Sequence, residues 1–329
     1  MVTNHVFEPL DPSQILASLW GGGGTLASKV TRSLSMPVTF LIEKLQALFP
    51  GETFTAGGGP RILSSGGRRY YGKVGTASEM EQYHAEKRSL QLMSAAAPGL
   101  CPSVISASHE GRPYLISDYL DLSSLSAFAG ASSILARRLA SELHTSKSEN
   151  GKYGFECPTF CGATKIDNGW YDTWAEAYNA MIGGLLDKLE RRGSYKELCI
   201  KGREIQEKVI PFYLGGRLKG VEPVLCHGDL WSGNVGADTD GNPAIFDPSS
   251  YYGHNESDLA IGRMFGGFST AFYDEYHSLR PKSEPVEEYS QRLKLYQLFH
   301  YLNHTVLFGN GYSGQSMNLA NQLLKSVPL

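Results

Sequence analysis

The chain has 329 residues, of which 41% are hydrophobic and 19% are charged. These values are typical of a globular protein, and the length suffices for two ordinary domains or one large bilobed domain. The formal net charge of −3 at pH 7 gives no strong positive field that could hold a nucleic acid backbone, so we expect no nucleic acid partner.

Residues 1–35 have the composition of an extension outside the folded core. They contain the glycine run from Gly21 to Gly24, and ordering this run in a regular element would cost much backbone entropy. We therefore expect a flexible N-terminal extension. Apolar residues at helical spacing begin at Met36, and Pro50 ends this predicted helix.

Glycines alternate with aromatic and aliphatic residues over 52–75. This pattern predicts a β-hairpin or meander with a glycine-rich turn, and its last strand carries Lys73. A helix is predicted over 78–97, with Ser78 as its N-cap. Two short strands are predicted next, at 103–108 and 114–117.

The sequence after Leu122 is mainly helical in pattern. Helices are predicted at 131–146, 170–191, 195–213, 256–279, 285–308 and 315–326. The exception is 224–247, where two apolar stretches flank a polar loop and predict a strand hairpin.

This order of elements predicts an α+β fold with two lobes. A small N-terminal lobe over 36–117 contains an antiparallel sheet plus a helix, and a hinge at 118–121 leads to a larger, mainly helical C-terminal lobe over 122–329. Ligands usually bind in the cleft of such an arrangement, so we expect the binding site between the two lobes.

The most informative segment begins at His227 and ends at Asn234, and Asp247 follows it at the end of an apolar stretch. The spacing from Asp229 to Asn234 equals that of the protein-kinase catalytic loop, in which the aspartate accepts the proton of the substrate hydroxyl and the asparagine holds magnesium. Carboxylate and amide oxygens are ligands that Mg²⁺ prefers. We therefore predict ATP-dependent phosphoryl transfer, with Asp229 as the catalytic carboxylate and Asn234 and Asp247 as the Mg²⁺ ligands.

The small lobe carries the residues that would meet the phosphates of ATP. Lys73 lies on a predicted strand and Glu86 on the predicted helix that follows. In kinases such a lysine touches the α- and β-phosphates and is oriented by a helix glutamate. Glu79 and Glu81 compete for this role, and Glu86 is preferred because it lies one turn before the apolar Leu90.

The five cysteines are few and scattered, which does not indicate a disulfide framework and fits a reducing compartment. Cys157 and Cys161 have the spacing of half a metal site, but no second pair completes it, so the sequence predicts no zinc site. No apolar run approaches the roughly 20 residues that cross a bilayer, and the N-terminus does not resemble a secretory signal. We expect a cytoplasmic protein without a membrane partner.

The run HGDLWSGN from His227 to Asn234 resembles the same motif in fructosamine/ketosamine 3-kinases. The segment DPSSYYGH from Asp247 to His254 is also similar to that family, and the resemblance covers roughly residues 50–328. Further matching segments are YGF at 153–155, CG at 161–162 and YLNH at 301–304. Some members of the family carry a cysteine in the glycine-rich loop that forms an intermolecular disulfide, and 52–75 contains none.

The resemblance implies a protein-kinase-like fold of the aminoglycoside/choline kinase type. It also implies ATP-dependent phosphorylation of the 3-hydroxyl of a ribulosamine or fructosamine, on a free amino acid or a glycated protein, as a deglycation repair activity. In such an enzyme the backbone of Asp118, Tyr119 and Leu120 would meet adenine. Asp258 would support the catalytic loop rather than touch substrate.

Aromatic residues near the motif are candidates for the sugar side of the pocket, because aromatic rings stack on sugar faces. The candidates are Trp231, Trp170, Tyr251 and His254. The competing interpretation is that these residues belong to the core, since buried Trp and Tyr more often pack than bind. His254 could equally be a hydrogen-bonded structural histidine.

Two other functions stay open at this stage. A kinase of the same fold could act on an aminoglycoside or choline, although such enzymes usually lack the Trp-Ser-Gly part of the motif. The chain could also be a catalytically silent pseudokinase, although every expected polar group is present. The preference between ribulosamine and fructosamine, and the oligomeric state, are not predicted.

Overall fold

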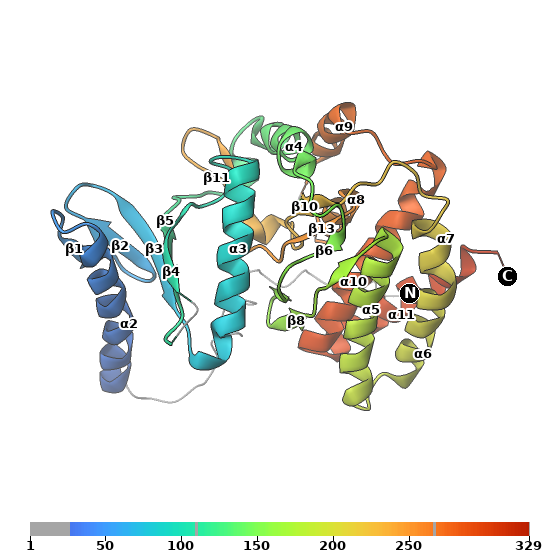
Figure 1. Ribbon diagram of the computed structural model, residues 1–329, viewed down its shortest axis with the longest axis horizontal. Helices are drawn as coiled ribbons and strands as arrows, with labels where there is room; N and C mark the ends of the chain where they lie inside the picture. The colour runs from blue at the N-terminus through green and yellow to red at the C-terminus, as the bar shows by residue number, and fades with distance from the viewer. Residues whose placement is uncertain (1–26, 109–110, 266–267, 329) are drawn as a thin grey trace, which may run out of the picture.

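The structure is a computed structural model of the chain, and it describes residues 27–108, 111–265 and 268–328. Figure 1 shows two lobes, a smaller one built around a sheet and a larger one that is mainly helical. The predicted α+β, bilobed architecture is confirmed. The predicted flexible extension falls mostly on residues 1–26, which lie outside the described residues.

The small lobe is built on a five-stranded antiparallel sheet in the order β1-β2-β3-β5-β4. Its strands are β1 Phe54–Ala56, β2 Arg61–Ser64, β3 Arg69–Val74, β4 Val104–Ser108 and β5 Tyr114–Asp118. Helix α2 (Ala27–Leu48), which begins before the predicted start at Met36, packs on one face. Helix α3 (Met80–Ala96) lies on the other face, between the sheet and the large lobe (Figure 1).

Side chains alternate between the two faces of each strand of this sheet. Tyr70 and Ile116 pack against Leu41 of α2 in the small-lobe core. Leu115, the neighbour of Ile116 on β5, points to the opposite face and packs with Leu90 of α3 in the larger hydrophobic core, which continues into the large lobe. The sheet is therefore packed on both faces, with the α3 face turned toward the cleft.

Gly72 of β3 sits beneath helix α2. A Cβ atom at this position would lie 2.8 Å from Cδ1 of Leu41, so glycine permits the close approach of helix and sheet. Because neighbouring residues face opposite ways, Lys73 points toward α3 and the cleft. Lys73 therefore lies on the face of the sheet that is turned toward the cleft, as its predicted role requires.

The entry into α3 differs from the predicted one. Thr76, rather than Ser78, precedes the first turn, and its backbone N–H donates to Oε2 of Glu79 at 2.8 Å in a capping box. A 3₁₀ turn over Ala77–Glu79 then leads into α3. Glu79 is occupied in this cap, so it does not compete with Glu86 for the lysine of β3.

The large lobe contains most of the helices. They are α4 Ala131–Ser141, α5 Trp174–Arg191, α6 Lys196–Glu204, α7 Ile210–Leu214, α8 Glu256–Ile261, α9 Thr270–Leu279, α10 Tyr289–Phe308 and α11 Asn310–Lys325. A π-helical segment over Ile205–Val209 joins α6 to α7 within the region predicted as one helix. Short 3₁₀ turns of the large lobe lie at Leu125–Ala127, Leu143–Thr145, Ser232–Asn234 and Val286–Glu288.

Several helix predictions were wrong in extent, including 131–146, where α4 ends at Ser141, and 315–326, where α11 begins at Asn310. The predicted helix at 170–191 begins only at Trp174, because the Thr173 hydroxyl accepts from the N–H of Glu176 in a capping box. The single helix predicted over 256–279 is two helices, α8 and α9. Gly262 ends α8 where the ring of Phe268 lies against its backbone, and a Cβ atom there would be 2.5 Å from that ring.

The strands of the large lobe form three small sheets. They are β6 Tyr153–Gly154, β7 Thr159–Cys161, β8 Thr164–Ile166, β9 Trp170–Tyr171, β10 Val224–Cys226, β11 Val235–Ala237, β12 Pro243–Ile245 and β13 Tyr251–Gly253. The hairpin predicted over 224–247 was wrong in its pairing, because β10 pairs with β13 and β11 pairs with β12. The polar loop between β10 and β11 is thus held between two different sheets.

The β11–β12 hairpin is tied to both the hinge and the small-lobe side. Ser123, just after the hinge, exchanges two backbone hydrogen bonds with Ala237 of β11, at 2.9 and 3.0 Å. The N–H of Ile245 in β12 donates to the carbonyl of Leu100 at 2.8 Å. Leu100 follows α3, so the hairpin is connected to the segment that carries that helix.

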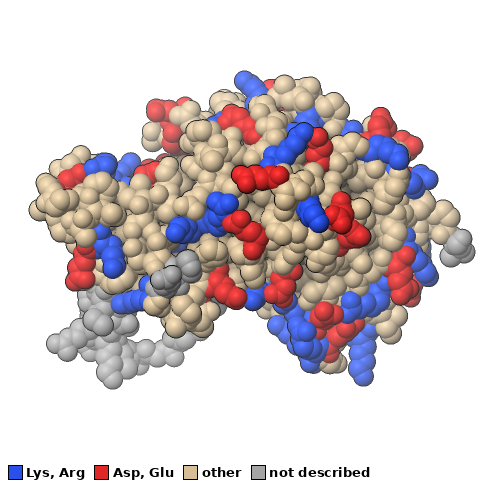
Figure 2. Space-filling view, in the orientation of Figure 1, with Lys and Arg blue, Asp and Glu red and all other residues tan. Residues whose placement is uncertain are grey.

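Positive and negative side chains are mixed on the visible surface. Figure 2 shows lysine and arginine interspersed with aspartate and glutamate over the visible face, without one sign dominating. Among the described residues, no helix combines the length and the apolar character needed to span a bilayer.

Candidate active site

Two adjoining cavities lie between the lobes. The first, of about 350 Å³, contains residues of both lobes, and the second, of about 320 Å³, lies beside the hinge. Glu86 and Asp247 line both cavities, so the two form one continuous crevice. The first is lined by Lys73, Gln82, Ala85, Glu86, Phe160, Gly162, Asp229, Trp231, Asn234, Asp247 and Pro248.

Lys73 and Glu86 form an ion pair at the small-lobe side of the crevice. Burial by itself would lower the pKa of Lys73, but the neighbouring Glu86 carboxylate outweighs burial and the pKa is raised. Lys73 therefore carries its positive charge at neutral pH. A fixed positive charge in this position can bind phosphate oxygens.

The loop between β10 and β11 brings Asp229 and Asn234 together. The N–H of Asn234 donates to the carbonyl of Trp231 at 2.9 Å, which closes the 3₁₀ turn Ser232–Asn234. The amide Nδ2 of Asn234 then donates to Asp229 twice, to the main-chain O at 2.9 Å and to Oδ2 at 3.2 Å. Because Nδ2 is used in this way, Oδ1 is the atom of Asn234 that can bind a cation.

Asp229 lies half-buried in the wall of the crevice. Burial raises its pKa to about 7, and the negative charges of Asp247 and Asp258 act in the same direction, against the hydrogen bond from Asn234. A carboxylate with a pKa near neutrality can accept a proton from a substrate hydroxyl more readily than an ordinary aspartate.

His227 connects the catalytic loop to the segment that carries Asp247. Its Nδ1 accepts from the N–H of Asp229 at 3.2 Å, and its Nε2 donates to the carbonyl of Phe246 at 2.9 Å. These contacts define a neutral ring with the proton on Nε2. Burial lowers the pKa of His227, which keeps it in this neutral form.

Asp258 at the start of α8 supports the loop from behind. Its Oδ2 accepts from the N–H of His227 at 2.6 Å and its Oδ1 from the N–H of Gly228 at 2.8 Å. His144 adds a third contact at 3.2 Å from Nε2 to Oδ2. Asp258 is 1% exposed and lines neither cavity, so it positions the loop and is out of reach of a ligand in the crevice.

Asp247 has an unusual backbone conformation, with a φ of 54° in the left-handed region. Aspartate tolerates this region better than most residues. The N–H of Phe246 donates to the carbonyl of Asn234 at 3.0 Å, which fixes Asp247 beside the catalytic loop. The carboxylate is exposed to the crevice, so Asp247 and Asn234 together offer the oxygen ligands that suit Mg²⁺.

Gly228 lies where the loop after β10 passes close to the backbone of Ser249, and this position requires glycine. Its φ is 84°, and a Cβ atom would lie 2.0 Å from the carbonyl O of Ser249. Both observations exclude a side chain at this position. The glycine of the His-Gly-Asp motif therefore lets the two loops approach closely.

The predicted hinge residues line the second cavity. Asp118, Tyr119 and Leu120 all contribute to its wall, together with Tyr71 and Phe246. The N–H of Tyr119 donates to the carbonyl of Arg69 at 3.1 Å, which joins the hinge to β3. The hinge residues therefore lie at the cavity that adjoins the one lined by Lys73.

The structure separates the predicted substrate residues. Trp231 lines the first cavity, and its ring meets that of Phe265 edge-on with centroids 5.7 Å apart. Trp170, Tyr251 and His254 line neither of the two cavities. Their predicted contact with substrate stays a prediction, because these two cavities do not include them.

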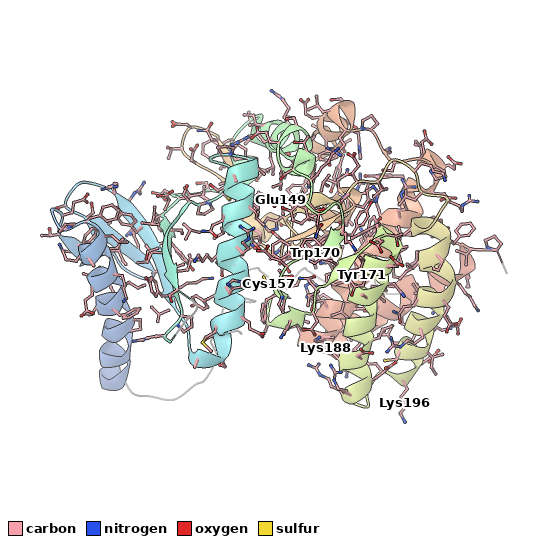
Figure 3. All side chains as sticks on the ribbon, viewed as in Figure 1. Glu149, Cys157, Trp170, Tyr171, Lys188 and Lys196 are labelled. Carbon is pink, nitrogen blue, oxygen red and sulfur yellow. The ribbon has the colours of Figure 1, made fainter. Side chains whose placement is uncertain are left out.

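Each of these three side chains has a packing role instead. Tyr251 is buried and stacks on Trp174, with ring centroids 5.9 Å apart. His254 is fully buried and is hydrogen-bonded to the hydroxyl of Tyr296 at 2.8 Å, the structural alternative considered for it. Trp170, labelled in Figure 3 just before α5, is 37% exposed and packs on Tyr252.

Sequence reasoning missed several residues of the site. Phe160, Gly162 and Gln82 line the first cavity without having been predicted. A ring nitrogen of His300 and the sulfur of Cys161 lie close to the Asp229 carboxylate. Their distances along the chain left no spacing signal that could have connected them.

Comparison with known proteins gives a family match. The model of the fructosamine kinase family matches residues 42–326. The ketosamine-3-kinase of Mus musculus is 44% identical over 175 residues, which are 53% of this chain and 54% of that protein. A candidate ketoamine kinase of Synechocystis is 32% identical over 306 residues, which are 92% of this chain and 96% of that protein.

Solved structures agree on the fold. A candidate fructosamine-3-kinase from Thermobifida fusca has a TM-score of 0.74 at 22% identity, covering 87% of this chain and 99% of its own. A choline kinase from Streptococcus pneumoniae has a TM-score of 0.57 at 16% identity, covering 88% and 98% of the two chains. At these identities the likeness concerns the fold alone.

Proposed function

Because this chain belongs to the fructosamine kinase family, we propose that it is an ATP- and Mg²⁺-dependent ketosamine 3-kinase that phosphorylates the 3-hydroxyl of ribulosamines or fructosamines. Relatives named ketosamine-3-kinase and protein-ribulosamine 3-kinase support this reaction. The observation that carries the proposal is the shared cavity of Lys73, Asp229, Asn234 and Asp247.

The proposed mechanism divides the work between the two walls of the crevice. Lys73, held by Glu86, binds phosphate oxygens, and the hinge backbone at 118–120 receives the adenine of ATP. Asn234 and Asp247 would hold Mg²⁺, which neutralises charge on the transferred phosphoryl group. Phosphoryl transfer depends mainly on positioning and charge neutralisation, so these few groups are sufficient.

Asp229 is the proposed catalytic carboxylate. It orients the acceptor hydroxyl and accepts its proton, while Asn234 fixes the carboxylate through Oδ2. Trp231 is the proposed aromatic contact of the sugar, because it lines the same cavity. The product 3-phosphate would destabilise the ketosamine adduct, so the proposed role is deglycation of proteins or small amines.

The proposed location is the cytoplasm. All five cysteines are free thiols, which fits a reducing compartment. Glycated proteins and free glycated amines of that compartment are the proposed partners.

The experiment that tests the function is an acceptor panel scored by mass spectrometry for added phosphate. The full chain is incubated with ATP, Mg²⁺ and, separately, a ribulosamine, a fructosamine, choline and an aminoglycoside. Phosphate on the ketosamines is the expected result. Transfer to choline or the aminoglycoside in preference to both ketosamines would favour the alternative function that the likeness of the fold to choline kinase leaves open.

A further inference from the structure

Two side chains that could bind a metal and that the proposed reaction does not use, Cys161 and His300, lie beside the proposed catalytic carboxylate of Asp229. Cys161, Asp229 and His300 each offer a ligand atom, and the three atoms lie within 4.8 Å of one another. They come from three separate elements, namely the end of β7, the catalytic loop and α10. The amide Nδ2 of Asn303 donates to the carbonyl of Cys161 at 3.2 Å, which fixes α10 against β7.

His300 provides the second indication of a ligand. Its side chain is 4% exposed, and its Nδ1 has no hydrogen-bond partner. Buried polar atoms are normally hydrogen-bonded, so an unpartnered ring nitrogen is an exception that needs a cause. A neutral imidazole offers the lone pair of one ring nitrogen to a metal.

We propose that Cys161, Asp229 and His300 form an inhibitory site for Zn²⁺, distinct from the Mg²⁺ site of Asn234 and Asp247. Thiolate and imidazole ligands favour zinc, whereas Mg²⁺ requires oxygen ligands. In tetrahedral zinc sites the ligand atoms are about 3.3–3.8 Å apart, given bond lengths of about 2.0–2.3 Å. Adjustments of about 1 Å in the side chains would therefore complete the site.

The site can be reached from the crevice. Phe160, Gly162 and Asp229 line the first cavity, so an ion entering from the cavity meets Asp229 first. Three protein ligands leave a fourth position for water on the cavity side. Zinc bound here would occupy the carboxylate that accepts the hydroxyl proton, and the enzyme would lose activity without unfolding.

A second group of similar composition does not qualify. His144, Cys226 and Asp258 also approach within 4.8 Å of one another, and all three are buried. Both oxygens of Asp258 already accept hydrogen bonds from the loop. Metal binding there would break the support of the catalytic loop, so this group serves the structure.

The first test measures binding alone. Co²⁺, which reports its ligands through absorption, is titrated into the chelator-treated full chain without nucleotide. We expect one equivalent to produce a thiolate-to-cobalt charge-transfer band that Zn²⁺ abolishes. Cys161→Ser should lose the band, and Cys157→Ser, a change at the half-buried cysteine labelled in Figure 3, is the matched control that should keep it.

His300→Gln keeps the thiol and so gives an independent comparison if Cys161→Ser does not fold. Its Co²⁺ affinity should fall by roughly tenfold or more, since even residues behind a metal ligand contribute about that much. Absence of the band in the unmodified chain, its persistence in Cys161→Ser, or equal Co²⁺ affinity in His300→Gln would each overturn the proposal.

The second test measures inhibition and rests on the proposed kinase function. Zn²⁺ is added at saturating Mg²⁺, and each variant is compared with its own rate in chelator. The inhibition constant for Zn²⁺ should rise about tenfold or more in Cys161→Ser. An equal inhibition constant in the unmodified chain and in Cys161→Ser would mean that zinc acts at the Mg²⁺ ligands instead, which would contradict the proposal. The binding test needs no turnover, so failure of the kinase assignment is recognised separately.

Discussion

Asp229 and Asp258 are neighbouring carboxylates of one loop system, but their pKa values are shifted in opposite directions. Burial raises the pKa of both. At Asp258, the hydrogen bond from His144, the electrostatic effect of His144 and His227, and the hydrogen bond from the N–H of Gly228 outweigh burial and lower the pKa. At the half-buried Asp229, fewer donors compensate, and the pKa is raised to about 7.

Burial acts on both carboxylates, so the donors that compensate it account for the opposite directions of the two pKa shifts. Asp258 is the more buried of the two, and its ionised form is stabilised because it accepts hydrogen bonds from backbone and side-chain donors. Asp229 faces the crevice with part of its hydrogen-bonding capacity unused. One carboxylate therefore supports the loop, and the other is available for a proton.

The largest effect is expected at the reactive member of the pair. Asp229→Asn removes the proton acceptor and should lower kcat by about 10³-fold. The free energy of unfolding should stay within about 0.5 kcal/mol of the original or rise, because a poorly compensated charge is removed. Steady-state kinetics, chemical denaturation and ATP binding by calorimetry measure these effects. Full turnover in this variant would contradict the division of roles.

The supporting member should respond in the opposite way. Asp258→Asn replaces a charged acceptor of three hydrogen bonds and should lower the free energy of unfolding by about 2 kcal/mol. Activity should fall by about tenfold because the loop is displaced (about 1.4 kcal/mol of transition-state stabilisation). Denaturant titration and kinetics on the same preparation test this, and a loss of activity without any loss of stability would give Asp258 a direct chemical role.

The dependence of stability on pH sharpens the contrast. The folded-state pKa of Asp258 lies below its usual value, so its stabilising contribution is present above about pH 4 and is lost as the pH falls through the folded value. The difference in unfolding free energy between the original chain and Asp258→Asn should therefore shrink as the pH is lowered toward that range. Urea titrations at a series of pH values measure it, and a constant difference would argue against an ionised Asp258.

The smallest effect on stability is expected at Tyr251, which is hydrogen-bonded to Ser257, the residue before Asp258. Tyr251→Phe removes a hydroxyl that is hydrogen-bonded to Ser257 at 2.9 Å and keeps the ring stacked on Trp174. The free energy of unfolding should fall by about 1 kcal/mol. The KM for the ketosamine should not change, and Trp231→Ala is the matched variant in which it should rise. A raised KM in Tyr251→Phe would restore its predicted contact with substrate.

The grouping of Lys73, Glu86, Asp229, Asn234 and Asp247 at one cavity could be predicted from sequence because the motif is local. The spacing from Asp229 to Asn234 lies within one loop, and Lys73 and Glu86 lie on consecutive elements. The structure places these residues at one cavity. Their roles in binding and catalysis remain the proposals stated above.

Other features depend on tertiary contacts and left little trace in the sequence. Strand pairing was missed because β10 pairs with the later β13, and short apolar stretches do not encode their partners. The burial of Tyr251 and His254 was not predicted, because aromatic residues suit a core as well as a pocket. Cys161 and His300 meet only through the packing of α10 against β7, which the fixed spacing of motifs does not reveal.

The hairpin that leads from Asn234 to Asp247 has a consequence for motion. It is bonded to Ser123 beyond the hinge and to Leu100 after α3, so it is anchored to the chain on both sides of the hinge. Because it is bonded on both sides of the hinge, the hairpin should restrain rotation of the lobes, and the proposed nucleotide half of the site should remain assembled. Sugar exchange could then proceed around a retained nucleotide, an order of release that pre-steady-state kinetics can detect.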